Sequence, residues 1–223
     1  MKSAHKATNL SRRQFIVGSA AAGSGLVLGF NLPFGTAEAK GAATASEVNA
    51  WVTIKSNETV HVRIARSEMG QGTITGLAQM VAEELECDWK HVSVEYITPA
   101  QNLQRKRVWG EMGTGGSRGI RTSEDYVRRG GAAARMMLMQ AAADQWKVPV
   151  GELSVDKGVI THAASKKKTT YGKVAAAAAK VSPPDAKSIT LKDPRTWKIA
   201  GKPLKRLDTT EKLDGSIKYA IDL

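Results

Sequence analysis

Two short glycine-rich segments carry the residue types in this sequence best suited to binding a charged ligand. Both combine glycines with side chains that can donate hydrogen bonds: Gly70, Gln71, Gly72 and Thr73 in the first, and Gly115, Gly116, Ser117 and Arg118 in the second. Each precedes a predicted helix, whose N-terminus attracts anions through its unpaired N–H groups and its dipole. Glycine also lets a ligand approach the backbone closely. We therefore predict that the two segments converge on one elongated anionic ligand.

The polar side chains of these segments suggest what each would contact. Gln71 can offer an amide donor and an acceptor to the edge of a heterocycle, and Arg118 and Arg121 can pair with phosphate in a fork. A purely structural interpretation competes with this one, because Gly-x-Gly is also a common connection from a strand to a helix. The sequence has no GxxxxGKS phosphate loop, and the segment that begins at Gly70 lacks the third glycine of a GxGxxG motif.

Other residues that often do chemistry have plainer interpretations here. His61, His91 and His162 are not spaced like the ligands of a metal site, so we interpret them as packed or solvated side chains. The single cysteine, Cys87, has no histidine paired with it in the sequence and is expected to be a small buried apolar residue. We predict no metal site formed by side chains, and we identify no nucleophile or other catalytic residue.

Hydrophobic periodicity predicts an α+β fold in which helices pack on one face of a mixed sheet. Strands are predicted at residues 51–55, 59–64, 91–98, 153–156, 159–162 and 216–223, and helices at 73–86, 122–146 and 171–180. The polar, glycine-containing residues 100–121 are predicted to form one long loop. The last predicted strand has nothing after it to pair with, so we expect the 223 residues to be the front part of a longer protein.

Two details of the predicted helices bear on packing. In the helix at 73–86, the carboxylates of Glu83, Glu84 and Glu86 fall mostly off the apolar face, and we expect them to face solvent. In the helix at 122–146, Gly130 and Gly131 cost helix stability, about 1 kcal/mol each relative to alanine. Such a pair predicts the close approach of another backbone or of a ligand.

Composition and charge exclude several classes of protein. With 42% hydrophobic residues the chain can form a packed core, and one cysteine excludes a disulfide scaffold. The formal net charge is +12, and residues 165–223 alone carry 14 basic and 6 acidic residues. Few aromatic residues accompany these lysines and no nucleic-acid-binding motif is present, so we predict a solvated basic surface and no nucleic-acid partner. Binding of an anionic polymer through this region is the alternative.

The first 39 residues have the features of an export signal. Arg12 and Arg13 precede a weakly apolar stretch, and Ala37-Glu38-Ala39 forms a small-residue cleavage site. The adjacent arginines resemble a twin-arginine signal, which implies export to the periplasm in the folded state. An uncleaved membrane anchor is the alternative, although six glycines and serines make the stretch a poor spanning helix. We therefore divide the chain into a signal (1–39), a main domain (40–182), and a linker with the start of a following domain (183–223).

At these residues the sequence resembles the molybdopterin-binding large subunit of the xanthine dehydrogenase/aldehyde oxidase family. The closest similarity is to the exported branch that includes the isoquinoline 1-oxidoreductase beta subunit. The resemblance is carried in order by several motifs, which include Ser67-Glu-Met-Gly-Gln-Gly-Thr, Val81-Ala-Glu-Glu-Leu, Thr114-Gly-Gly-Ser, Gly130-Gly-Ala-Ala-Ala-Arg and Lys212-Leu-Asp-Gly. None of these motifs is specific alone, but their ordered set is.

The resemblance implies a molybdenum hydroxylase that oxidises aldehydes or N-heterocycles with oxygen derived from water. It implies a molybdenum–molybdopterin cytosine dinucleotide cofactor, a partner subunit with two [2Fe–2S] clusters, and a membrane-bound cytochrome c subunit as a further partner. Residues 70–73 and 115–118 would then line the cofactor. Arg118 and Gly119 stand where the family has small polar or β-branched residues.

The resemblance also sets limits on what this chain would do by itself. Family members are several times longer, and the glutamate that acts as general base has no counterpart here. The chain would then carry part of a cofactor cradle without that base. A non-catalytic exported binding module, or a truncated gene product without cofactor, is the alternative.

Overall fold

The structure is a computed structural model that describes residues 45–222 of the chain. The chain divides into two compact units, residues 1–41 and 42–223, and every element described here belongs to the second. The signal predicted at residues 1–39 lies outside the described residues. Within residues 45–222, no helix combines the length and the apolar character needed to cross a membrane.

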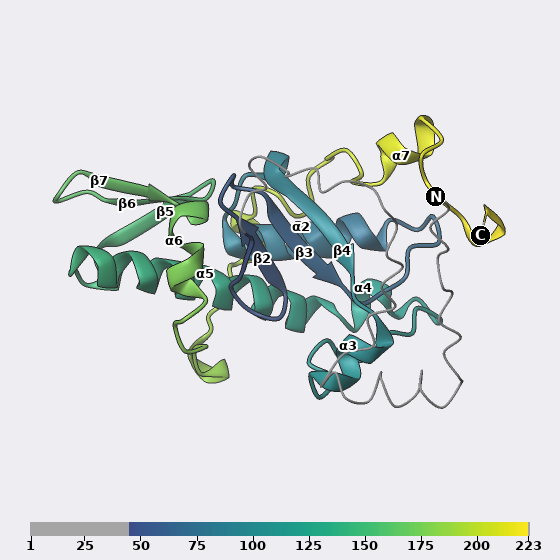
Figure 1. The fold of residues 1–223 in the computed structure, drawn as a ribbon, viewed down its shortest axis with the longest axis horizontal. Helices are drawn as coiled ribbons and strands as arrows, with labels where there is room; N and C mark the ends of the chain where they lie inside the picture. The colour runs from purple at the N-terminus through teal and green to yellow at the C-terminus, as the bar shows by residue number, and fades with distance from the viewer. Residues whose placement is uncertain (1–44, 223) are drawn as a thin grey trace, which may run out of the picture. The chain divides into compact units, whose positions relative to one another are not determined.

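A four-stranded mixed sheet forms the centre of this unit (Figure 1). Its strands, in spatial order, are β1 (Ala45–Glu47), β2 (Val52–Lys55), β3 (Val60–Ile64) and β4 (Val92–Tyr96). β1, β2 and β3 pair antiparallel, whereas β4 runs parallel to β3. Alternation along β3 buries Val60, Val62 and Ile64 in the core. The predicted α+β class with a mixed sheet is therefore confirmed.

Two helices cover one face of this sheet, as Figure 1 shows. α2 (Thr73–Leu85) connects β3 to its parallel neighbour β4, and α5 (Glu124–Trp146) packs against α2. A Cβ atom added to Gly131 would lie 2.5 Å from the carbonyl oxygen of Val81 in α2, and one added to Gly130 would lie 2.5 Å from the ring of Trp51. The predicted close approach is confirmed, and internal packing is what requires both glycines.

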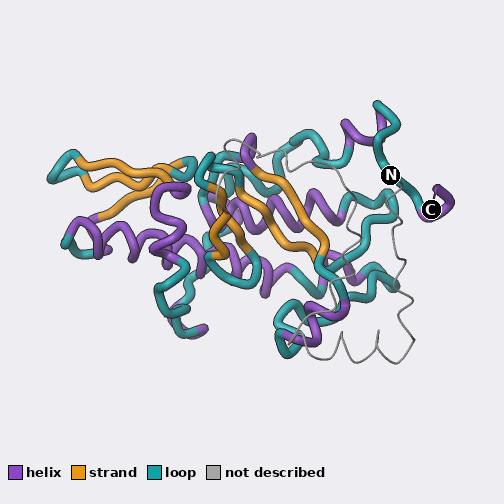
Figure 2. The backbone as a smooth tube through the Cα atoms, viewed as in Figure 1, coloured by secondary structure: helices purple, strands orange, loops and turns teal. Residues whose placement is uncertain are grey.

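A second sheet of three antiparallel strands follows α5 (Figure 2). It consists of β5 (Leu153–Asp156), β6 (Val159–His162) and β7 (Lys167–Thr170), and α6 (Tyr171–Ala178) comes next. The hairpin of β5 and β6 was expected from the sequence, but β7 was not, because Lys167 and Lys168 give it no apolar alternation. The hydroxyl of Tyr171 donates to the carbonyl of Leu85 (2.6 Å) and so joins α6 to the end of α2.

The segment predicted as one long loop at residues 100–121 is partly helical, which corrects the prediction. It contains α3 (Pro99–Gln104) and α4 (Arg118–Arg121). α3 begins with a capping box, in which the Thr98 hydroxyl accepts from Gln101 N–H and the Gln101 side chain accepts from Thr98 N–H. The length of the polar stretch obscured this local signal.

The described residues after α6 contain short turns and no strand. 3₁₀ turns occur at Ala186–Ser188, Pro194–Thr196 and Ala220–Asp222, and α7 spans Thr209–Leu213. The strand predicted at residues 216–223 is therefore absent from residues 216–222, and the backbone N–H of Ile217 instead donates to the carbonyl of Glu211 (3.1 Å). An alternating pattern forms a strand only where another strand offers an edge to pair with.

Candidate functional site

The two glycine-rich segments predicted to bind a ligand lie next to each other. We call residues 67–72, which precede α2, loop 1, and residues 113–117, which precede α4, loop 2. Arg66, which directly precedes loop 1, is buried and donates to the carbonyl of Gly113 in loop 2, and also to the Thr122 hydroxyl (2.9 Å) and the Ser123 hydroxyl (3.0 Å). The backbone N–H of Ser67 in loop 1 also donates to the Thr114 hydroxyl of loop 2 (3.1 Å).

The helices that follow the loops also touch. A Cβ atom on Gly119 would lie 2.8 Å from the Thr73 hydroxyl oxygen, and one on Gly76 would lie 3.1 Å from the Ile120 side chain. Glycine at these two positions therefore lets α4 pack directly against the first turn of α2. This packing brings Thr73, the last of the four predicted residues of the first segment, against Gly119, the residue after the four of the second.

Loop 1 is shaped by an acidic residue that the sequence analysis had not singled out. The Glu68 carboxylate accepts from the backbone N–H groups of Gly70 (2.8 Å), Gly72 (2.8 Å) and Ile74 (3.1 Å). Burial by itself raises the pKa of Glu68, but these N–H groups, together with Arg206, lower it below its ordinary value. The N-terminus of α2, which we predicted to attract an anionic ligand, thus already holds an internal carboxylate.

Gln71 also bonds within loop 1. Its side-chain oxygen accepts from the backbone N–H of Met69 (2.5 Å), and its amide nitrogen donates to the carbonyl of Ser67 (2.8 Å). One of its two amide hydrogens remains for another acceptor. Met69, at the tip of the loop, is 71% exposed, so loop 1 presents an apolar side chain and an amide to the outside.

A C-terminal segment, residues 204–213, lies against loop 1, and we call it the strap. Arg206 donates to the Gly70 carbonyl (2.9 Å) and to Glu68 (3.1 Å), and Asp208 accepts from the same guanidinium (2.9 Å and 2.8 Å). These bonds from Arg206, together with a bond from Lys212, hold the pKa of Asp208 well below its usual range. The Leu207 N–H donates to the Thr75 hydroxyl (3.1 Å), which fixes the strap to the first turn of α2.

Loop 2 differs from loop 1 because its backbone donors are not used. The N–H groups of residues 113–117 donate to no other described residue. A Cβ atom on Gly115 or Gly116 would meet nothing within 4 Å, and Ser117 has a positive φ of 55°. Neither internal contact nor a positive φ requires glycine at position 115. Loop 2 is therefore an open run of backbone donors.

Exposed arginines stand on the helix that follows loop 2. Arg118 donates to the Gly115 carbonyl (3.0 Å) and to Glu111 (3.2 Å), and Arg121 donates to the Gly116 carbonyl (3.3 Å). An open groove of about 640 Å³ adjoins the loop, and its lining includes Leu103, Arg107, Gly110, Met112, Gly113 and Arg118. Two arginines, Arg107 and Arg118, and the first residue of loop 2, Gly113, thus line the same groove.

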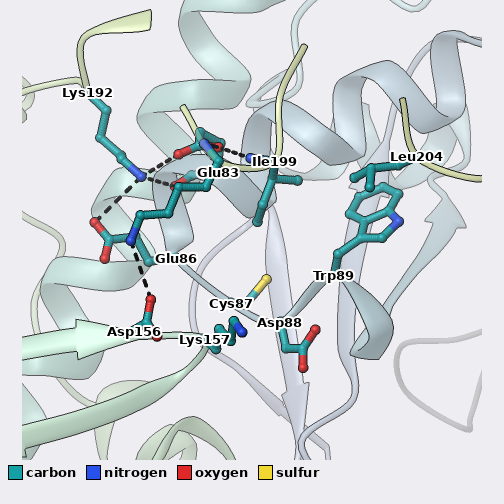
Figure 3. Close-up of a pocket in the computed structure, with 11 residues that line it drawn as sticks. Glu83, Glu86, Cys87, Asp88, Trp89, Asp156, Lys157, Lys192, Ile199 and Leu204 are labelled. Atoms are coloured by element: carbon teal, nitrogen blue, oxygen red, sulfur yellow. Dashed lines mark hydrogen bonds and ion pairs between the residues drawn. The ribbon is translucent and has the colours of Figure 1, made fainter. Parts of the chain in front are cut away.

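A second cavity, of about 180 Å³, lies at the opposite end of α2, far along the helix from the two loops (Figure 3). Its lining includes Glu83, Cys87, Trp89, Lys192, Ile199 and Leu204. Figure 3 shows the Lys192 side chain reaching Glu83 and Glu86. The carboxylates at this cavity are already paired, so it offers little to a ligand.

The prediction that Glu83 and Glu84 face solvent is wrong. Glu83 is 1% exposed, and its carboxylate accepts from Lys192 and from the backbone N–H groups of Lys198 (2.8 Å), Ile199 (2.5 Å) and Ala200 (3.2 Å). Glu84 is completely buried against Arg128 (2.8 Å). Residues 192–200 cover this face of α2, which periodicity within the helix cannot reveal. One signal was available in the sequence: the C-terminal segment is polar and irregular, so its backbone N–H groups need hydrogen-bond acceptors elsewhere in the chain.

The histidines and the cysteine have structural surroundings. His61 pairs with the Ser93 hydroxyl (2.6 Å), and His162 lies between Ser165 (2.7 Å) and Glu152 (2.8 Å). Burial raises the pKa of the Cys87 thiol to about 12, as expected for an unreactive buried residue. Within residues 45–222, no group of three or more metal-ligating side chains comes together.

Nearly the whole length of the sequence matches the model of one known protein family. Residues 3–218 match the molybdopterin cofactor-binding domain. The chain belongs to the molybdopterin cofactor-binding domain family. The resemblance on which the sequence analysis relied is thereby confirmed, and binding of a molybdopterin cofactor is the property that the family shares.

Two curated proteins are similar to most or all of this chain. The isoquinoline 1-oxidoreductase subunit beta of Brevundimonas diminuta is 29% identical over 258 residues, which cover 100% of this chain and 33% of that protein. A membrane-bound aldehyde dehydrogenase (pyrroloquinoline-quinone) of Gluconacetobacter polyoxogenes is 30% identical over 224 residues, 96% of this chain and 28% of that protein. The chain thus spans about a third of the length of these relatives.

Solved structures give weaker matches. A Cu,Mo-CO dehydrogenase in its carbon-monoxide-reduced state aligns with a TM-score of 0.43 and 25% identity, over 56% of this chain and 15% of that one. Quinoline 2-oxidoreductase from Pseudomonas putida 86 aligns with a TM-score of 0.38 and 18% identity, over 56% and 15%. The family assignment rests on the sequence match.

Proposed function

We propose that loops 1 and 2 form one wall of the cofactor site in a molybdenum-dependent oxidoreductase that acts on aldehydes or N-heterocycles. Membership of the molybdopterin cofactor-binding family supports the cofactor, and the names of the two relatives support the substrate class. The single observation that carries the proposal is that loop 2, which adjoins loop 1, has N–H groups at residues 113–117 that donate to no other residue within 45–222.

The donors of the two loops fit an anionic group attached to a heterocycle. The free N–H groups of Gly115, Gly116 and Ser117 suit phosphate oxygens, and the nearby guanidinium of Arg118 adds positive charge. Gly115 keeps its surface clear of side-chain atoms, which lets a ligand reach the backbone. On loop 1, the remaining amide hydrogen of Gln71 suits an acceptor on a ring edge.

The bound molybdenum group would supply the two-electron redox chemistry, and the residues of this chain would hold and orient it. Loop 1 and loop 2 would fix the position of the cofactor through Gln71 and residues 115–118, with no proton transfer assigned to either loop. We assign no catalytic residue within residues 45–222, because the carboxylates beside the two loops, Glu68 and Glu111, already accept hydrogen bonds from within the chain.

We further propose the cytosine dinucleotide form of the cofactor, a partner subunit with two [2Fe–2S] clusters, and a membrane-bound cytochrome c subunit as electron acceptor. Export to the periplasm through the twin-arginine sequence of residues 1–39 completes the proposal. These finer points are supported by the sequence resemblance and by the membrane-bound relative.

The test is to purify the full chain together with its genomic downstream sequence from cells that make molybdenum cofactors. We expect molybdenum in near-stoichiometric amount and a released cytosine nucleotide. Folded protein that contains neither would contradict the proposal and favour a non-catalytic binding module. A released nucleotide of another base would refute only the cytosine form.

A matched pair of glycine variants tests the role of loop 2. Gly115→Ala and Gly151→Ala each add a methyl group in open space at a position without positive φ, so neither should destabilise the fold. We expect Gly115→Ala to reduce the molybdenum content at least about fivefold. The added methyl group would lie between the backbone and the ligand, and such overpacking weakens binding by about 1 kcal/mol. Gly151→Ala, in the 3₁₀ turn before β5, should retain the wild-type content. Equal contents would remove loop 2 from the site.

A further inference from the structure

The Glu68 carboxylate occupies the position at which an anionic ligand would meet the N-terminus of α2. Its two oxygens accept three backbone N–H bonds, from Gly70, Gly72 and Ile74, all between 2.8 and 3.1 Å. The side chain is only 10% exposed. A helix N-terminus neutralised in this way has little remaining attraction for a second anion.

The same carboxylate joins the strap to loop 1. Arg206 donates to Glu68 (3.1 Å) and to the carbonyl of Gly70 (2.9 Å), and Asp208 binds the other side of the guanidinium. Lys212 donates to Asp208 (2.6 Å), so two acidic and two basic groups form a balanced cluster. The N–H groups of Gly70 and Gly72 and the carbonyl of Gly70 are therefore held from within the chain.

We propose that Glu68 is a positioning residue for the cofactor: its carboxylate and Arg206 hold loop 1 in its ligand-binding shape before any ligand arrives. This inference rests on the proposed function. Glu68 takes the N–H groups of Gly72 and Ile74 at the start of α2, and the negative part of the ligand is left to the loop 2 donors that bond to no described residue. Loop 1 then contributes only neutral contacts, through Met69 and Gln71.

Holding loop 1 in its binding shape in advance should strengthen ligand binding. A glycine-containing loop that must be ordered by its ligand loses backbone entropy on binding, and that loss weakens affinity. Gly70 and Gly72 have φ angles of +100° and +84°, so the unrestrained loop would sample many other shapes. Bonds from Glu68 to the N–H groups of both residues remove that freedom in advance.

The chain offers a matched control in Glu58. Its carboxylate also accepts a backbone N–H at a helix N-terminus, from Gly172 (2.9 Å) in α6, and it accepts from the Thr170 hydroxyl (2.5 Å). It belongs to the turn between β2 and β3 and bonds to none of the residues of either loop. Glu58→Gln therefore removes the same kind of charge without touching the candidate site.

The experiment has a first arm that needs no cofactor. Amide hydrogen exchange is measured on the cofactor-free full chain for the wild type, Glu68→Gln, Arg206→Gln and Glu58→Gln. We expect exchange at Gly70, Gly72 and Ile74 to accelerate about tenfold or more in Glu68→Gln, and by a smaller factor in Arg206→Gln, with no change in Glu58→Gln. Unchanged exchange in both loop 1 variants would overturn the inference, as would equal acceleration in the control.

The second arm measures binding of molybdopterin cytosine dinucleotide by its pterin fluorescence under anaerobic conditions. We expect Glu68→Gln to bind about tenfold more weakly than Glu58→Gln, with Arg206→Gln between them. Normal binding by Glu68→Gln despite faster exchange would overturn the positioning role. If the wild type itself does not bind, the proposed function fails, and the first arm still decides whether Glu68 orders loop 1. Should Glu68→Gln not fold, Arg206→Gln carries both arms.

The pH profile separates positioning from a general loss of structure. The groups that face Glu68 are Arg206 of the strap, the Tyr96 hydroxyl at the end of β4, and beyond Arg206 the Asp208–Lys212 pair. Arg206 and Lys212 hold the pKa of Asp208 well below its usual range, so Glu68 is the carboxylate of this cluster whose protonation the profile follows as the pH falls. Wild-type binding should therefore weaken toward the Glu68→Gln level as the pH falls through the pKa of Glu68. A constant ratio between the two at all pH values would contradict the role.

Discussion

The two ends of α2 use the same chemical device in different surroundings. At the N-terminal end, the carboxylate of Glu68 accepts N–H bonds from Gly70, Gly72 and Ile74. At the C-terminal end, the carboxylate of Glu83 accepts N–H bonds from residues 198–200, which arrive from far along the chain. In both places a carboxylate satisfies backbone donors that no regular secondary structure satisfies.

Burial separates the two ends. Glu83 and Glu84 are 1% and 0% exposed, and their partners Lys192 and Arg128 are covered as well. Glu68 lies under an exposed loop tip and is reached by the half-exposed Arg206. A buried charge is costly to change, whereas one near the surface can be exchanged with little loss. The comparison teaches that the same device fixes a buried packing contact at the C-terminal end of the helix and the shape of an exposed loop at its N-terminal end.

The largest effect is expected at the buried end. Glu84→Ala leaves the buried Arg128 guanidinium with the exposed Glu124 as its one carboxylate partner among the described residues, beside the Lys192 carbonyl, and should lower the free energy of unfolding by about 3–5 kcal/mol. Urea unfolding followed by circular dichroism measures the change. Glu124→Gln removes the exposed partner of the same arginine and should cost less than about 1 kcal/mol. Similar losses in the two variants would show that burial does not distinguish these pairs.

The middle of α2 should give the next largest effect. A methyl group on Gly131 would meet the backbone of Val81 at 2.5 Å, and backbone cannot move aside like a flexible side chain. We expect Gly131→Ala to lower the melting temperature and to cost about 1–3 kcal/mol, although alanine favours helix. Gly151→Ala serves as the control and should be neutral or slightly stabilising. A stabilised Gly131→Ala would mean that α2 and α5 are less closely packed than described.

A smaller, pH-dependent effect is expected at the N-terminal end. Glu68→Gln should cost about 1 kcal/mol at neutral pH, as expected for the loss of a helix-capping charge. Because the folded protein lowers the pKa of Glu68 below 4.5, ionisation stabilises the fold above that pH, and the stabilisation is lost as the pH falls through the lowered pKa. The difference in stability between wild type and variant should therefore shrink in acid and stay constant around neutrality.

Thermal unfolding of both proteins across this pH range checks the prediction. Glu58→Gln provides the baseline for removing a carboxylate elsewhere. A difference that grows in acid would have the wrong sign and would show that the charged form of Glu68 is not the stabilising one.

The smallest effect is expected at loop 2. Arg118→Gln removes an exposed ion pair with Glu111, whose side chains are 44% and 73% exposed, and should change stability by less than about 0.5 kcal/mol. Its effect on the affinity for the dinucleotide cofactor should be far larger than its effect on stability. Calorimetry of the free protein and a binding titration measure the two. A substantial loss of stability would show that Arg118 supports the fold, as Glu83 and Glu84 do at the C-terminal end of α2.

Local sequence signals predicted the elements that hold the site. The apolar spacing of Ile74, Leu77 and Leu85 predicts α2, and all three are buried. The alternation at residues 59–64 predicts β3, and the acids after Thr122 predict the start of α5 close to Glu124. These predictions succeed because the pattern and the element occupy the same few residues.

Features that depend on distant residues were missed or wrongly assigned. β7 forms because β6 offers an edge, not because Lys167 and Lys168 favour a strand. Glu83 lies within a helix and resembles a surface residue until residues 198–200 cover it. The role of Glu68 depends on the curvature of loop 1, which brings its carboxylate back to Gly72 and Ile74. In each case the partner is close in space and its position is not written in the neighbouring sequence.

The sequence by itself determined the helix and strand periodicities, the glycine-rich segments and the motif order that marks the cofactor-binding family. Only the tertiary structure decided that these segments adjoin, that loop 1 is held by its own carboxylate, and that loop 2 keeps its donors. The physical reason is that a hydrogen-bond donor has the same identity in any sequence, while its availability depends on which acceptor the folded chain brings within 3 Å. Identity is a local property of the residue, and availability is a property of the whole fold.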